Sequence, residues 1–109
     1  MGELPVHAGS VTLLAMALHE LATNAVKHGA LSCPEGSATL GWTVEDARVE
    51  LDWSEIGGPP VSEPTREGFG SQLIAEAAER LPQGALRRVF RPEGLRVTIT
   101  FDRQDRAAT

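Results

Sequence analysis

The chain has 109 residues and a formal net charge of -5 at pH 7. This length allows one domain with a hydrophobic core, and the negative charge argues against a broad nucleic-acid interface. No apolar run approaches the roughly 20 residues that span a bilayer, and no signal-peptide pattern opens the chain. The single cysteine, Cys33, excludes an internal disulfide and fits a reducing compartment. We therefore expect a cytoplasmic protein without membrane contact.

The spacing of apolar and turn-forming residues predicts the secondary structure in chain order. Ser10 is expected to cap the first helix and Gly29 to stop it, while Ser71 opens the second helix and Pro82 ends it. The predicted elements are a helix over residues 10–27, strands over 38–44 and 48–53, a helix over 71–81, and strands over 85–90 and 95–101.

The order of these elements predicts the fold class. Helix, hairpin, long loop, helix and hairpin indicate an α+β fold, a two-layer α/β sandwich with helices on one face of a mixed, mostly antiparallel sheet. The loop over residues 57–70 is longer than a dozen residues, and such loops in compact domains are usually functional or disordered.

The first candidate motif lies on the first predicted helix. Glu20, Asn24 and Lys27 share one stripe because they are spaced i, i+4 and i+7. An amide oxygen can bind magnesium, the neighbouring carboxylate can bind the ion's waters or accept a proton, and the ammonium can neutralise a phosphate. A solvated helix face is the alternative interpretation. The residues predicted to pack, on an arc rotated by roughly 120°, are Leu14, Leu18, Leu21 and Ala25.

The second candidate motif follows the second predicted strand. Glu55 stands at the end of that strand, and Gly57 and Gly58 let the backbone come close to a flat ligand. Because a carboxylate accepts hydrogen bonds and never donates them, Glu55 suits the amino group of adenine. An ordinary turn leaving a strand is the alternative.

The third candidate motif is the segment Gly68-Phe69-Gly70-Ser71, which leads into the second helix. Glycines allow successive N–H groups to point inward, and a helix N-terminus adds partial positive charge, so an acidic protein can still hold phosphate here. A simple N-cap at Ser71 is the alternative. Because no strand directly precedes the segment, neither the P-loop nor the dinucleotide-binding fingerprint applies.

These three motifs, in this order, resemble the ATP-binding catalytic domain of bacterial sensor histidine kinases, in the GHKL ATPase group with its Bergerat-type ATP-binding fold. Residues 19–25 resemble the N-box of the HWE histidine kinases, residues 53–59 their Trp-x-Glu form of the G1 box, and residues 68–71 the G2 box. The likeness runs from about residue 13 to residue 101, nearly the whole chain.

The resemblance implies ATP and Mg²⁺ as cofactors and gives the motif residues roles. Asn24 would be the magnesium ligand and Glu20 its helper or the general base, while Lys27 would contact phosphate and Glu55 would read adenine. The other nucleotide contacts implied are His28 at the rim, Gly57 and Gly58 under the base, and Gly68, Phe69, Gly70 and Ser71 in a lid over the phosphates.

Two further residues are family markers without a clear mechanism, His19 and Trp53. We expect His19 to have an orienting or packing role, since it points away from the stripe of Glu20, Asn24 and Lys27. We expect Trp42 and Trp53 to be core aromatics. Gln72 departs from the family, which usually has a basic residue at that position, so one phosphate contact is expected to be weaker.

The resemblance also implies partners. The γ-phosphate of ATP would pass to a histidine on a dimerisation helix, and from there to a response regulator. Only 18 residues precede the N-box, so we expect an excised catalytic domain or a kinase acting in trans. Two alternatives stay open: a serine kinase of the anti-sigma-factor type, whose Asn-Ala-x-x-His-Gly pattern matches residues 24–29, and a non-catalytic docking domain on the same fold.

Overall fold

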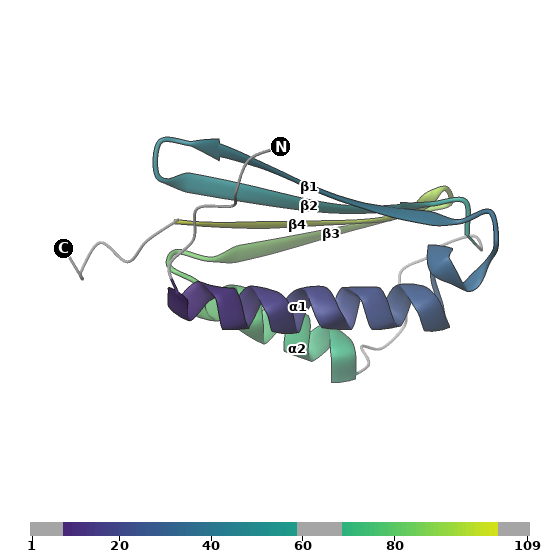
Figure 1. Ribbon diagram of the computed structural model, residues 1–109, viewed down its shortest axis with the longest axis horizontal. Coiled ribbons are helices and arrows are strands. Elements are labelled where there is room, and N and C mark those ends of the chain that lie inside the picture. Colours follow the sequence, from purple (N-terminus) through teal and green to yellow (C-terminus); the bar gives the residue numbers. More distant parts are fainter. Residues whose placement is uncertain (1–7, 59–68, 103–109) are drawn as a thin grey trace.

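The computed structural model describes residues 8–58 and 69–102 of the chain. Two helices cover one face of a four-stranded sheet, so the described part has two layers (Figure 1). The helices are α1 (Ala8–Lys27) and α2 (Phe69–Arg80), with the short 3-10 helix η1 (Ala30–Ser32) after α1. The strands are β1 (Ser37–Glu45), β2 (Arg48–Ile56), β3 (Ala85–Arg91) and β4 (Gly94–Asp102). This arrangement confirms the predicted α+β two-layer sandwich.

The sheet has the strand order β1-β2-β4-β3. A mixed, mostly antiparallel sheet was expected, and every strand pairing in the described residues is antiparallel. Both hairpins, β1–β2 and β3–β4, form as predicted, and the pairing of β2 with β4 places β2 in the interior of the sheet. The pairing with β4 extends to Ser54, and the last two residues of β2, Glu55 and Ile56, are paired with β1.

The core lies between the sheet and the helices. On α1 the buried side chains include Leu14, Leu21 and Ala25, as predicted, whereas Leu18 is only partly buried. Both tryptophans, Trp42 and Trp53, pack against the core from the sheet, which confirms their expected place. The buried members of the core cluster are Leu14, Ala17, Leu21, Val49, Leu51, Ile74, Ala77, Ala78, Leu81, Val97, Ile99 and Phe101.

Three local predictions were wrong. The first helix begins at Ala8, so Ser10 lies in its first turn, buried, rather than at its N-cap. The first helix ends at Lys27 as predicted, but Gly29 has φ -109°, which is not the left-handed conformation of a glycine C-cap. The second helix begins at Phe69, two residues before Ser71, so Gly70 lies inside the first helical turn.

None of the described helices is long and apolar enough to cross a membrane.

Candidate functional site

The predicted polar stripe of α1 exists as a geometric feature. Because α1 is continuous to Lys27, the side chains of Glu20, Asn24 and Lys27 project from the same side of the helix. Glu20 and Asn24 are half-buried, whereas Lys27 and the following His28 are exposed. None of these four side chains makes a hydrogen bond within residues 8–58 and 69–102. The stripe therefore offers polar groups that the described chain does not use itself.

The backbone of Asn24 has a separate structural role at the end of α1. Its carbonyl oxygen accepts the N–H of His28 at 2.8 Å and that of Gly29 at 3.2 Å. These hydrogen bonds satisfy a carbonyl that the end of the helix would otherwise leave without a partner. The side chain of Asn24 is thus placed by the last turn of α1, immediately before the chain turns into η1.

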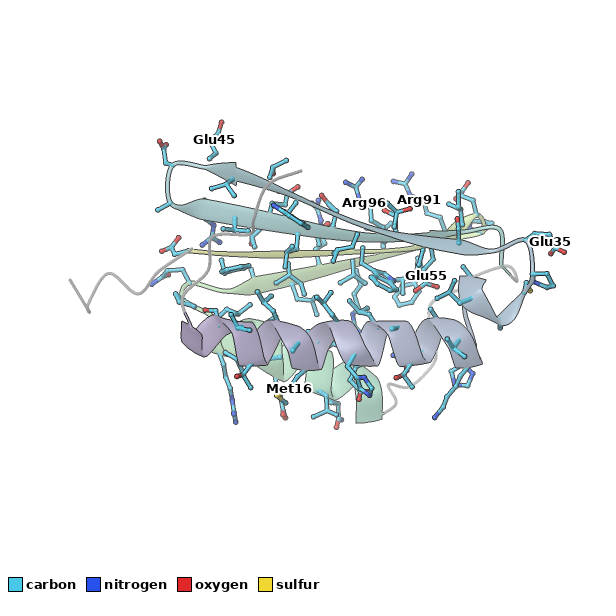
Figure 2. The ribbon with its side chains drawn as sticks, viewed as in Figure 1. Met16, Glu35, Glu45, Glu55, Arg91 and Arg96 are labelled. Carbon is cyan, nitrogen blue, oxygen red and sulfur yellow. The ribbon has the colours of Figure 1, made fainter. Side chains whose placement is uncertain are left out.

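Glu55 lies on the face of β2 that is covered by the helices, between the sheet and α1 (Figure 2). The residue is only 3% exposed. Oε1 accepts the backbone N–H of Ala30 at 3.1 Å, and Oε2 accepts the indole Nε1–H of Trp53 at 2.7 Å. A buried carboxylate needs hydrogen-bond donors to offset its desolvation, and here each oxygen has one.

Glycines allow the backbone after α1 to lie directly against this carboxylate and against the end of β2. A Cβ added at Gly29 would overlap Oε1 of Glu55, and one added at Gly58 would overlap the backbone of Ala30. Gly57 has φ +82°, a conformation that favours glycine. The structure therefore brings the backbone that follows α1, at Gly29 and Ala30, together with the G1 segment. This close approach of two backbones also explains, without any ligand, why positions 57 and 58 are both glycine.

The third motif is described only in part. Gly68 lies outside the described residues, as do the side chains of Phe69 and Ser71, so their predicted phosphate contacts stay predictions. The first turn of α2, which includes Gly70, is described as backbone. Helix α2 packs against α1, and it begins on the side of the molecule where η1 lies (Figure 1).

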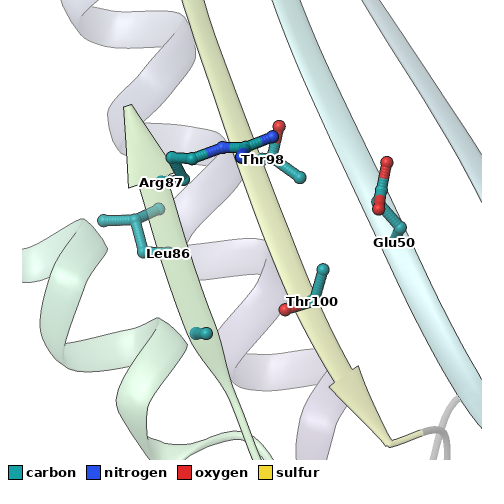
Figure 3. A pocket seen from close by; sticks show the side chains of 6 residues that line it. Glu50, Leu86, Arg87, Thr98 and Thr100 are labelled. Atoms are coloured by element: carbon teal, nitrogen blue, oxygen red, sulfur yellow. The ribbon is translucent and has the colours of Figure 1, made fainter. Parts of the chain in front are cut away.

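Two hollows occur on the open face of the sheet, opposite the helices. One, of about 260 Å³, is lined by side chains that include Glu50, Arg87 and Thr98 (Figure 3). The other, of about 380 Å³, lies beside it and is bordered by Arg91 and Arg96. Glu55 also lines the second hollow, but neither hollow includes a residue of α1, so neither contains the polar stripe predicted to bind magnesium and phosphate.

A metal site built from several acidic or histidine side chains is not present in the described part of the chain. No group of three His, Cys, Asp or Glu residues there could hold a metal ion.

The sequence has curated relatives, although no protein-family model matches it. It is 48% identical over 95 residues to blue-light-activated histidine kinase 1 of Erythrobacter litoralis, and this match covers 84% of the chain. It is 38% identical over 101 residues to the blue-light-activated histidine kinase of Brucella anthropi. The chain is a relative of the histidine kinases. It spans 26% and 21% of the length of these two proteins, so it corresponds to one part of them.

Solved histidine kinase structures have the same fold. The blue-light-activated histidine kinase EL346 of Erythrobacter litoralis matches 99% of this chain with a TM-score of 0.80 and 17% identity, over 35% of its own length. The catalytic domain of histidine kinase ThkA matches 86% of the chain with a TM-score of 0.68 and 17% identity, over 68% of its own length. The resemblance to a histidine kinase catalytic domain is thus confirmed at the level of family and fold.

For this histidine kinase relative, the sequence interpretation missed one feature of the site. Trp53 was expected only to pack, and its indole donates to Glu55. The alternation of Val49, Leu51 and Trp53 on the buried face of β2 continues to Glu55, because side chains of a strand alternate between faces. That period of two could have shown that the Trp-x-Glu spacing puts both side chains on one face.

Proposed function

We propose that this chain is the ATP- and Mg²⁺-binding catalytic domain of an HWE-type histidine kinase, acting in cytoplasmic two-component signalling. It transfers the γ-phosphate of ATP to a histidine on a separate dimerisation helix, and a response regulator is the indirect partner. The proposal rests above all on Asn24, whose half-buried side chain makes no hydrogen bond within the described residues. A partly exposed amide that no group of the described chain uses is accessible from solvent and can offer its oxygen to a ligand.

The stripe on α1 fits a magnesium ion bound to phosphate. The Asn24 amide supplies one oxygen ligand, and Glu20, one turn earlier, accepts hydrogen bonds from the ion's waters or takes a proton from the attacking histidine. Lys27, one turn later, binds phosphate as a point charge. When bound, magnesium would neutralise charge on the phosphates; the protein residues position the reacting groups, which is most of the catalysis in phosphoryl transfer.

Glu55 is the residue we propose for reading adenine. A carboxylate has about four acceptor positions, and the N–H groups of Ala30 and Trp53 occupy one on each oxygen. In this proposal the amino group of adenine donates to one of the acceptor positions that these two donors do not occupy. Gly57 and Gly58 follow directly and allow the base to lie close to the backbone.

A serine kinase of the anti-sigma-factor type is the alternative on the same fold. The pattern of residues 24–29 supports it equally. The curated relatives at 48% and 38% identity are named histidine kinases, which favours histidine as the phosphate acceptor. A non-catalytic docking domain, the third candidate, is disfavoured because Asn24 and Glu55 are both present.

Calorimetric titration with ATP and Mg²⁺ tests the proposal. We expect the wild-type chain to bind, Asn24→Ala to lose the magnesium-dependent part of the affinity, and the exposed substitution Thr12→Ala on the same helix to bind like wild type. A flat wild-type titration would reject nucleotide binding, and equal affinities for Asn24→Ala and wild type would reject the assigned ligand. Incubation with γ-labelled ATP should give no acid-labile phosphohistidine on this chain alone; its appearance would contradict transfer to a separate segment.

A further inference from the structure

The Trp-x-Glu pair at the end of β2 forms a connected unit. Trp53 and Glu55 are two residues apart on the same face of the strand, so the long indole lies along the strand toward the carboxylate. The resulting hydrogen bond, 2.7 Å from Nε1 to Oε2, is as short as charge-assisted hydrogen bonds usually are. Indole is a donor only, and the carboxylate is an acceptor only, so the polarity of this contact is fixed.

Two restraints act on the carboxylate from opposite elements. Trp53 holds Oε2 from the sheet, and the backbone N–H of Ala30 holds Oε1 from η1. A glutamate side chain has three rotatable bonds, and fixing it in one orientation costs conformational entropy. Because the protein already holds the carboxylate in one orientation, a ligand that bonds to its remaining acceptor positions does not incur this entropy cost.

We propose that Trp53 is a positioning residue for adenine recognition: its indole N–H holds Glu55 in the orientation that accepts the purine amino group. This inference rests on the proposed function and deepens it, because it assigns purine discrimination to a pair of side chains rather than to Glu55 alone. It also gives Trp53 a role that packing does not require.

The chain supplies a matched control. Trp42 lies on β1 and packs against the same core, opposite Leu51 of β2, and it makes no hydrogen bond within the described residues. Trp42→Phe and Trp53→Phe therefore remove the same atoms from the same face of the sheet. Only Trp53→Phe removes a donor from Glu55.

The experiment compares two nucleotides, ATP and purine riboside triphosphate, which lacks the 6-amino group. Each is titrated with Mg²⁺ into wild type, Trp42→Phe and Trp53→Phe. We expect wild type and Trp42→Phe to prefer ATP equally. Trp53→Phe should lose about two- to tenfold in ATP affinity, the range that corresponds to ordering one flexible side chain. Its affinity for purine riboside triphosphate should be unchanged, since that ligand does not use Glu55.

The outcomes separate this inference from the proposed function. If wild type binds both nucleotides and Trp53→Phe prefers ATP to the same extent as wild type, Trp53 does not position Glu55. The proposed function is unaffected by that result. Wild type that binds both nucleotides equally overturns the role of Glu55 in adenine recognition, and with it the inference. Wild type that binds neither overturns the proposed function as well.

A second measurement does not require Trp53→Phe to fold. The chain has two tryptophans, so in Trp42→Phe the indole N–H resonance of Trp53 is observed alone by NMR. We expect ATP to shift this resonance clearly more than purine riboside triphosphate does, because the amino group competes for the same carboxylate. Equal shifts with the two nucleotides, or no shift with either, would overturn the inference.

Discussion

Replacing Glu55 by Gln tests the arrangement at the end of β2 most directly. The carboxylate accepts two N–H groups, one on each oxygen, and 3% of the residue is exposed. An amide keeps the shape but offers one oxygen and one NH₂. Whichever way the amide is turned, its NH₂ faces either the Ala30 N–H or the Trp53 indole N–H. One buried donor then loses its acceptor.

The cost follows from that lost acceptor. Leaving a buried donor without a partner costs about 1–3 kcal/mol, while the lower desolvation cost of the amide offsets the weakening of the remaining bond. For a domain of this size each kcal/mol lowers Tm by about 4–8 °C. Thermal unfolding followed by circular dichroism measures the shift. Glu50→Gln is the matched control, because Glu50 is exposed on the opposite face of the same strand, and surface changes stay within about 0.5 kcal/mol. If Glu55→Gln melts within 1 °C (roughly 0.2 kcal/mol) of Glu50→Gln, the two hydrogen bonds do not carry the stability assigned to them.

Three further substitutions, one beside Glu55, one in the core and one on the surface, test the described structure by urea denaturation. Gly29→Ala should destabilise the protein by about 1–3 kcal/mol, because its Cβ overlaps the fixed carboxylate of Glu55. Gly41→Ala is the control, and it should be neutral or stabilising because its Cβ meets nothing within 4 Å. Equal urea midpoints for the two variants would contradict the close approach of Gly29 to Glu55. Leu51→Ala, at a residue 2% exposed, should cost about 2–5 kcal/mol, and a loss under about 1 kcal/mol would mean that β2 does not face the core as described. Arg48→Ala breaks an ion pair whose arginine side chain is 43% exposed, so we expect a loss of at most about 1 kcal/mol, and a larger loss would show a role beyond the surface.

The elements of this fold could be predicted from local patterns. The alternation along β2 and β4, and the helical spacing of Leu14, Leu21 and Ala25 on α1, result from burying one face of each element, so the sequence carries them directly. The errors lie at element ends, where the start of α1 was placed at Ser10 and the start of α2 at Ser71. Helix ends depend on a few weak capping interactions, which a residue pattern specifies poorly.

The motif residues were likewise visible in the sequence, and the curated relatives agree with the family that those motifs indicated. Their chemical types and spacing determined the candidate roles of Glu20, Asn24 and Lys27, because helical geometry alone puts them on one side of α1. The roles in binding stay predictions, each with the titration that tests it.

The chain order by itself determined the two layers, the hairpins and the polar stripe, since each depends on residues close together in sequence. Only the tertiary structure decided what surrounds Glu55. Its carboxylate meets Ala30, 25 residues away along the chain, and Gly29 is small because that oxygen lies against it. Contacts between distant segments depend on how the layers pack, and no local period of the sequence encodes that packing.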